Sequence, residues 1–261
     1  MSGTPPTSAM QLGSAGARFY AARSRLAGAQ KSNASVPAYL RFVNRKAGGL
    51  LAALGYAVGL TPTAVTLLSS ACSFLGIALL ILIHPSIAAG IAISLFLLLG
   101  YALDSADGQL ARVRGGGTKA GEWLDHVVDI AKITSLHSAV AISLLRYFDF
   151  DSLWPVAIPV VFLIANVTQF FGMMLRDKLI AGGTRRQPAG VGKQSSSALV
   201  AWVLLPLDHG TLCLALLVLG AHTLFLWCYG FLGLCTAAFA ARSLSRAYRQ
   251  LLALDPGTQP G

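Results

Sequence analysis

The sequence predicts an all-α integral membrane protein with six transmembrane helices preceded by an amphipathic surface helix. Hydrophobic residues make up 55% of the 261-residue chain and charged residues only 11%, whereas soluble proteins carry about 25% charged residues. A run of about 20 apolar residues is long enough to cross a bilayer as a helix. We expect six such spans, at residues 62–83, 86–111, 121–144, 153–175, 195–219 and 221–243.

The fifth span is the least regular of the six. The sequence Pro206-Leu207-Asp208-His209-Gly210 interrupts its hydrophobic stretch. The interruption is either a kink in the fifth helix or the start of an external loop. Asp149, Asp151 and Asp208 are assigned to external loops.

The region before the first span has two parts. Residues 1–35 are rich in Ser, Gly, Ala and Pro and lack the apolar region of a secretory signal, so we expect a disordered basic tail. The next segment mixes Arg41, Arg45 and Lys46 with leucines and is expected to lie on the membrane surface as a helix. The predicted divisions are a tail at 1–35, a juxtamembrane helix at 36–60, a membrane domain at 61–246 and a C-terminal tail at 247–261.

The net charge of +10 follows membrane topology, and no nucleic-acid partner is expected. Seven of the 20 basic residues precede the first span, and most others flank connections on the same side. Only Arg146 falls on the opposite side, and Lys132 lies within a span. Because basic residues favour the inner face, both termini are expected in the cytoplasm, with the chain in the plasma membrane of a prokaryote. The four cysteines show no metal-ligand spacing and are assigned to packing.

Acidic residues are concentrated where apolar helices are expected. Five of the ten lie between residues 104 and 129. Asp104 and Asp107 lie late in the second span, and Asp125 and Asp129 lie early in the third. Intramembrane carboxylates are costly and usually face a cavity, a partner or an ion. These four aspartates are therefore the leading candidates for a functional site.

Helical spacing brings the two aspartate pairs to similar depths. Separations of three and four residues place each pair on one helix face, and Gly115-Gly116-Gly117 favours a turn between the helices. At about 1.5 Å per residue, the first pair lies roughly 7 and 12 Å below Arg112, and the second pair roughly 9 and 15 Å below Lys119. The four carboxylates are therefore expected to converge.

Four converging carboxylates would repel one another and take up protons unless a cation were bound. Ligation by oxygen alone favours magnesium, manganese or calcium over zinc, and magnesium suits phosphate-bearing substrates. Four carboxylates are enough for two ions if some oxygens bridge. We expect two Mg²⁺ ions, with Mn²⁺ as the alternative.

Small residues next to the acidic pairs leave room for a substrate. Gly108 and Ala111 share one helix face with the first pair, and Gly121 lies one turn before the second. A nucleotide could contact the helices there without obstruction by side chains. Arg112, near the cytoplasmic surface, offers a fork of donors that suits a diphosphate.

The stretch DSADGQLARVRGGGTKAGEWLDHVVD, residues 104–129, resembles the complete signature of the CDP-alcohol phosphatidyltransferase family. That signature is Asp-x2-Asp-Gly-x2-Ala-Arg, eight further residues and Gly-x3-Asp-x3-Asp, and every fixed position is filled. The resemblance extends to the six-span layout, the surface helix and the sequence from Thr61 to Thr66. Thr63 stands where members often carry Asn.

The resemblance implies a six-helix fold with a polar cavity facing the cytoplasm and two magnesium ions. It implies transfer of a phosphatidyl-type group from a CDP-activated lipid, such as CDP-diacylglycerol, to an alcohol, with release of CMP. Asp104, Asp107 and Asp125 would be metal ligands, and Asp129 the general base with a share in metal binding. The implied contacts of the cytidine diphosphate part are Gly108, Ala111, Arg112 and Gly121. Thr66 would either contact the cytidine or bond within its own helix.

The sequence determines the acceptor alcohol less closely than the donor. Basic residues around the connection between spans four and five either enforce topology or bind a phosphorylated acceptor; they are Arg176, Lys178, Arg185, Arg186 and Lys193. The second reading, through Arg176 and Lys178, favours inositol phosphate or glycerol phosphate over choline. Lys132 either pairs with a carboxylate or meets an acceptor phosphate. His126 and Glu122 are expected to face the mouth of the site.

Two other classes of function compete with the enzyme. A cation transporter also places acidic residues in apolar helices, but it does not need Gly108, Ala111 and Arg112 at these intervals. A catalytically silent scaffold would be expected to lack metal ligands, and none is missing. The expected partners are a CDP-activated lipid, an alcohol acceptor and membrane lipids, and small residues in spans three and four could support a homodimer.

Overall fold

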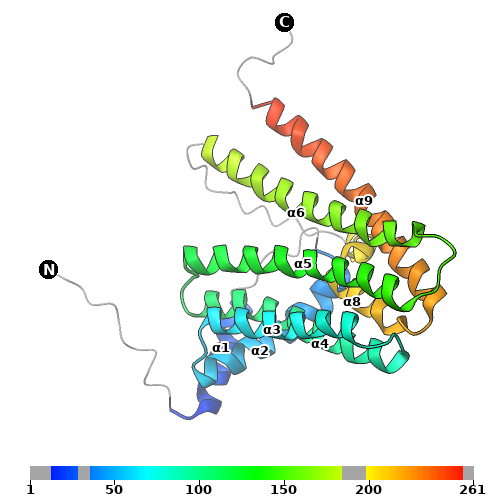
Figure 1. Cartoon of the computed structure of the whole chain (residues 1–261). Helices are drawn as coiled ribbons and strands as arrows, with labels where there is room; N and C mark the ends of the chain where they lie inside the picture. Colours follow the sequence, from blue (N-terminus) through cyan, green and yellow to red (C-terminus); the bar gives the residue numbers. More distant parts are fainter. Residues whose placement is uncertain (1–12, 29–35, 184–197, 255–261) are drawn as a thin grey trace, which may run out of the picture.

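The computed structural model describes residues 13–28, 36–183 and 198–254, and these residues form helices without any strand. Figure 1 shows the long helices lying side by side. The main helices are α1 (Ala15–Gly28), α2 (Arg45–Val58), α3 (Pro62–Leu82), α4 (Ile87–Val113), α5 (Lys119–Tyr147), α6 (Ala157–Gly183), α7 (Ala198–Val203), α8 (His209–Ala215) and α9 (His222–Leu252). The short helices are η1 (Leu40–Asn44), η2 (Trp154–Val156), η3 (Leu205–Leu207) and η4 (Leu216–Val218).

Five helices are long and apolar enough to cross a membrane. They are α3, α4, α5, α6 together with η2, and α9, and they match five of the six predicted spans. The predicted start of the first span agrees closely with the start of α3. Thr61 caps this helix by accepting a hydrogen bond from the Ala64 amide, and Pro62 fits its first turn.

The predicted fifth span is not a single helix. In its described part, residues 198–219, the chain forms α7, η3, α8 and η4 in succession. Helices α6 and α9, on either side of this region, run parallel. Residue numbers increase in the same direction along both helices where they touch. The contacting pairs are Ile158 and Gly230, Phe162 and Gly233, Gln169 and Ser243, and Gly172 and Leu244. The chain between α6 and α9 therefore has to return from one end of the bundle to the other.

Asp208 lies at the break and is buried, with 3% of its surface exposed. Its carboxylate accepts hydrogen bonds from the Gly210 amide at 2.9 Å, the Leu40 amide at 2.7 Å and the Tyr101 hydroxyl at 3.2 Å. The assignment of Asp208 to an external loop is therefore wrong. The aspartate begins α8 as its N-cap and joins this segment to η1 and α4.

The returning segment packs closely on α4. The Ser94 hydroxyl donates to the Cys213 carbonyl at 2.8 Å. A Cβ atom at Gly90 would collide with the backbone of Leu216. The absence of a side chain at this position therefore allows the two backbones to meet.

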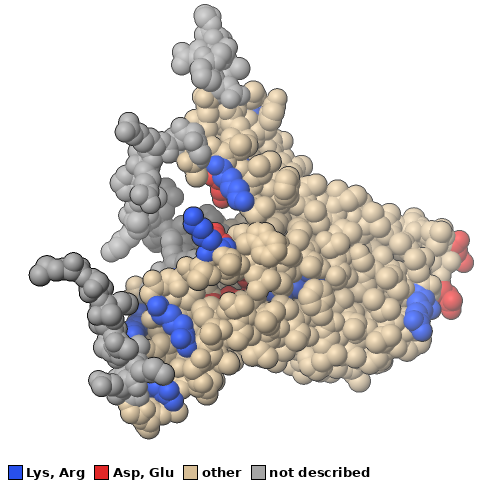
Figure 2. All heavy atoms as spheres, turned by 60° about the vertical axis from the view of Figure 1, so that its left-hand side comes forward, with Lys and Arg blue, Asp and Glu red and all other residues tan. Residues whose placement is uncertain are grey.

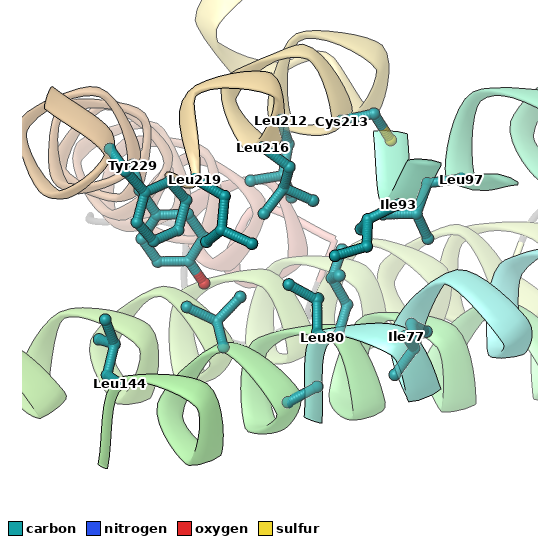
Figure 3. Close-up of a cluster of buried hydrophobic side chains, with 14 of the residues drawn as sticks. Ile77, Leu80, Ile93, Leu97, Leu144, Leu212, Cys213, Leu216, Leu219 and Tyr229 are labelled. Carbon is teal, nitrogen blue, oxygen red and sulfur yellow. The ribbon is translucent and has the colours of Figure 1, made fainter. Parts of the chain in front are cut away.

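A hydrophobic cluster fills the end of the bundle away from Asp104, Asp107, Asp125 and Asp129. Figure 3 shows side chains of α3, α4, α5, α8, η4 and α9 meeting there. The labelled members are Ile77, Leu80, Ile93, Leu97, Leu144, Leu212, Cys213, Leu216, Leu219 and Tyr229. Cys213 belongs to this core, and all four cysteines are free thiols. Their assignment to packing is consistent with this finding.

The amino-terminal region also packs on the bundle. Helix α1 lies within the segment expected to be a tail and buries Ala22 and Leu26 in a second cluster with α2, α3 and α4. The expected surface helix corresponds to η1 and α2, and it leaves Leu50, Leu54 and Val58 exposed.

A buried polar network joins α5, α6 and α9. The Asn166 amide contacts His137 Nε2 at 2.8 Å, and His137 Nδ1 contacts the Tyr229 hydroxyl at 2.5 Å. His137 and Tyr229 are almost completely buried. Since water does not reach these groups, each depends on the others for its hydrogen bonds.

We predict that Tyr229→Phe lowers the free energy of unfolding in mixed micelles by about 1 kcal/mol, because it removes the partner of His137 Nδ1. The measurement is unfolding by SDS, followed by circular dichroism. Tyr248→Phe is the control, since that tyrosine is exposed on the same helix. Equal stability of Tyr229→Phe and the wild type would contradict a stabilising role for the network.

Candidate active site

A tight hairpin joins the two helices that carry the aspartates. Gly115 and Gly116 have φ angles of 96° and 132°, in the region that favours glycine. Thr118 then begins α5 by accepting a hydrogen bond from the Gly121 amide at 3.0 Å. The predicted turn is confirmed, and it reverses the chain so that α4 and α5 both pack on α3.

The hairpin brings the four carboxylates together as the spacing predicted. Oxygens of Asp104, Asp107 and Asp125 lie within 4.8 Å of one another. Ligand atoms of Asp125, His126 and Asp129 form a second group within the same distance. The two groups share Asp125, so the four aspartates form one continuous acidic site.

Helix α3 contributes a hydroxyl to this site. Thr66 Oγ1 lies 2.6 Å from Asp107 Oδ2 and 3.2 Å from the Pro62 carbonyl of its own helix. The expected bond within the helix is therefore present, together with one to a carboxylate. Thr66 and Asp107 are both buried, so the hydroxyl fixes one oxygen of Asp107.

Lys132 pairs with the carboxylates, which is one of the two roles left open by the sequence. Its ammonium lies 2.6 Å from Asp104 Oδ1 and 3.4 Å from Asp129 Oδ1. It also donates to Ser69 Oγ at 3.1 Å. The contact with α3 through Ser69 was not predicted, because the two residues are far apart in the sequence.

The small residues lie beside the acidic groups. A Cβ atom at Gly108 would have Arg112 Nη1 as its nearest neighbour, at 3.5 Å. One at Gly121 would meet Thr118 Oγ1 at 3.1 Å. The guanidinium of Arg112 therefore extends back toward Gly108, and Ala111 lies half-buried between them in the sequence.

His126 was expected to face the mouth but lies within reach of the acidic group. Its ring meets Phe170 of α6 edge to face, with centroids 6.0 Å apart. The imidazole therefore connects the acidic site to α6. The signal in the sequence was its position between two of the aspartates.

Basic residues gather at the end of the bundle where the aspartates lie. Figure 2 shows acidic side chains recessed between basic ones at this end, next to a broad and almost uncharged band. Arg176 is paired with its neighbour Asp177 through Nε at 2.9 Å, and Lys178 is exposed. Arg185, Arg186 and Lys193 lie outside the described residues.

A further basic group lies on α9. Its residues line a hollow, and they are Arg242, Ser245, Arg246 and Arg249. Ser243 donates to Gln169 of α6, next to Phe170, which in turn contacts His126. Arg242, at one end of the hollow, therefore adjoins the residue of α9 that contacts α6 beside Phe170. From their place after the last span, these arginines were expected only to set membrane topology.

The family model for CDP-alcohol phosphatidyltransferases matches residues 59–239. The chain belongs to this family. It is thus a multi-pass membrane transferase of phospholipid biosynthesis, and the resemblance of the signature is confirmed. The match covers α3 to most of α9, including the whole acidic hairpin.

A solved structure has a similar fold. The crystal structure of Mycobacterium tuberculosis phosphatidylinositol phosphate synthase (PgsA1) with CDP-DAG bound aligns with a TM-score of 0.52 and 19% sequence identity. The alignment covers 85% of this chain and 98% of that chain. No curated protein gives a significant sequence match.

The acidic site has the donors that a divalent cation of this family requires. Three carboxylates, those of Asp104, Asp107 and Asp125, offer oxygens within 4.8 Å of one another. Hard cations such as Mg²⁺ and Mn²⁺ prefer oxygen ligands of this kind. The residues present therefore fit a divalent metal.

We predict that Thr66→Val weakens Mn²⁺ binding by about tenfold, because groups that orient a metal ligand typically contribute about 10- to 100-fold in affinity. Titration followed by electron paramagnetic resonance measures free Mn²⁺. Ser70→Ala is the control, since the Ser70 hydroxyl donates to the Thr66 carbonyl of its own helix. Unchanged affinity in Thr66→Val would show that its bond to Asp107 does not affect metal binding.

Proposed function

We propose that the chain transfers a phosphatidyl-type group from a CDP-activated lipid, such as CDP-diacylglycerol, to an alcohol, and releases CMP. The observation that carries the proposal is the convergence of the four signature aspartates between α4 and α5. Membership of the family supports the general reaction. The similar structure was solved with CDP-DAG bound, which supports a CDP-lipid as the donor.

Asp104, Asp107 and Asp125 would hold Mg²⁺, with Mn²⁺ as a substitute, and Asp129 would share in binding a second ion. Bound metal would neutralise the pyrophosphate and stabilise the charge of the departing CMP. The Thr66 hydroxyl supports this assignment, because it holds one oxygen of Asp107 in a fixed position. The carboxylate of Asp107 is thereby aimed before any ion binds.

Asp129 would act as general base. Its carboxylate takes the proton of the acceptor hydroxyl, whose oxygen attacks the lipid-side phosphorus. The bond from that phosphorus to the CMP oxygen breaks as the new ester forms. Asp129 lies within 4.8 Å of Asp125 through their ligand atoms, so the proposed base and the metal-binding group adjoin.

The cytidine diphosphate part would lie against the small residues of the hairpin. Gly108, Ala111 and Gly121 present little side chain to a nucleotide, and Arg112 reaches back over Gly108. A guanidinium suits a diphosphate because it offers several donors in a fixed fork. Thr66 would lie next to this nucleotide site, because its hydroxyl is bonded to Asp107.

We infer six membrane crossings, because the parallel course of α6 and α9 requires a return between them. The fifth crossing would be the broken segment that contains α7 and α8. Both termini and the acidic site would then lie on the cytoplasmic side of a prokaryotic plasma membrane. We also propose a homodimer held by contacts between small residues of the third and fourth spans.

A phosphorylated alcohol is the proposed acceptor. The arginines of the α9 hollow, together with Arg176 and Lys178 of α6, place positive charge at the end of the bundle where the aspartates lie. Guanidinium groups recognise phosphate well. Inositol phosphate and glycerol phosphate are the candidates, and the first agrees with the name of the similar structure.

We predict that Asp129→Asn lowers CMP release by about 10²- to 10⁴-fold, which is the usual contribution of a general base. Binding of CDP-diacylglycerol, measured by calorimetry in detergent, should remain detectable. Asp151→Asn is the control, because this exposed aspartate lies in the connection before α6. Normal turnover in Asp129→Asn would exclude this residue as the base.

We further predict that purified protein releases CMP when supplied with CDP-diacylglycerol, Mg²⁺ and inositol phosphate or glycerol phosphate, but not choline. Arg246→Gln should raise the KM for that acceptor by about tenfold, because a charge-assisted hydrogen bond is lost. Arg146→Gln, at the far end of α5, is the control. Cation flux in proteoliposomes without dependence on CDP-lipid would instead favour a transporter.

A further inference from the structure

Lys132 occupies a site built by three helices. It is buried in α5, one turn beyond Asp129, and lies outside the family signature, which ends at that aspartate. Its ammonium reaches Asp104 of α4, Ser69 of α3 and Asp129 of its own helix. An ammonium has three donors, and each of them has an oxygen partner here.

The Ser69 contact is itself held in place. The Ser69 hydroxyl donates to the Gly100 carbonyl of α4 at 2.8 Å, so its lone pair is available to Lys132. A Cβ atom at Gly100 would lie 3.1 Å from the Ser69 carbonyl and would collide with the Ser73 hydroxyl. Close contact between α3 and α4 therefore fixes the oxygen that accepts the hydrogen bond of the lysine.

The lysine joins the two parts of the acidic site. It contacts Oδ1 of Asp104, which also belongs to the group with Asp107 and Asp125. It contacts Oδ1 of Asp129, the proposed base. In each case one carboxylate oxygen, Oδ1, is engaged by the ammonium, so the lysine restrains both side chains.

We propose that Lys132 is a positioning residue that holds Asp104 and Asp129 and supplies fixed positive charge to the acidic site. A consequence is that the site binds divalent cations less tightly than its four carboxylates alone would, since the ammonium repels them. The role in turnover rests on the proposed function. The effect on cation affinity does not, because it follows from charge and distance.

The test compares Lys132→Met with Lys132→Arg in purified full-length protein. Mn²⁺ binding is measured without substrate by electron paramagnetic resonance, and kcat and acceptor KM are measured by CMP release. Lys132→Met should bind Mn²⁺ about tenfold more tightly, because one repelling charge is removed. Its kcat should fall by about 100-fold with acceptor KM unchanged, because Asp129 is no longer held.

Lys132→Arg should keep the Mn²⁺ affinity of the wild type within about twofold and recover part of kcat, because it retains the charge and several donors. Lys119→Met is the matched control, since this exposed lysine begins the same helix and should leave Mn²⁺ affinity unchanged. If Lys132→Met does not fold, Lys132→Gln removes the same charge while keeping a donor, and it carries the same prediction.

Two results would overturn the proposal. A raised acceptor KM with unchanged Mn²⁺ affinity would make Lys132 an acceptor contact. Lower thermal stability with unchanged Mn²⁺ affinity and kcat would make it only a structural tie between helices. If the wild type released no CMP with any acceptor, the proposed function would fail, but the Mn²⁺ comparison would still decide the charge effect.

Discussion

Four carboxylates inside an apolar helix bundle are unstable without partners, and the surrounding structure supplies those partners. Asp107 receives the hydroxyl of Thr66, and Asp104 and Asp129 share the ammonium of Lys132. Buried charges are tolerated when they are paired and hydrogen-bonded. The acidic hairpin therefore depends on α3, which lies outside the signature and contributes both Thr66 and Ser69.

The demands of this site explain the small residues between α3 and α4. Short side chains at Ser69, Ser73 and Gly100 allow the helices to approach closely enough for hydroxyl groups to reach across. In a membrane, where helices gain little from burying apolar surface against one another, such close packing supplies much of their association. The packing that stabilises the pair is thus the same packing that completes the site.

The sequence predicted the parts of the molecule that local rules control. Five long apolar runs became helices, and the spacing of Asp104, Asp107, Asp125 and Asp129 placed their carboxylates together, because helix geometry fixes short-range positions. The triple glycine and Thr118 likewise defined the hairpin.

Long-range contacts account for what the sequence could not predict. The burial of Asp208 depends on Leu40 and Tyr101, which are distant in the sequence, so its polar surroundings resembled those of a loop. The contact of Lys132 with Ser69 and the hollow lined by the α9 arginines also depend on how helices pack. Basic residues near the end of a membrane helix can simply set its orientation. No local sequence pattern distinguishes such residues from ones that form a binding surface.

The bond between the Leu40 amide and Asp208 has a consequence for biosynthesis. The two residues are separated by 168 positions, so the partner of Leu40 does not exist until most of the protein has been translated. The α3–α5 hairpins can insert and pair earlier, since their contacts lie closer along the chain. This bond must therefore form late in maturation, after the ribosome has passed the break before α8, whereas the contacts of η1 and α2 with α4 need no such delay.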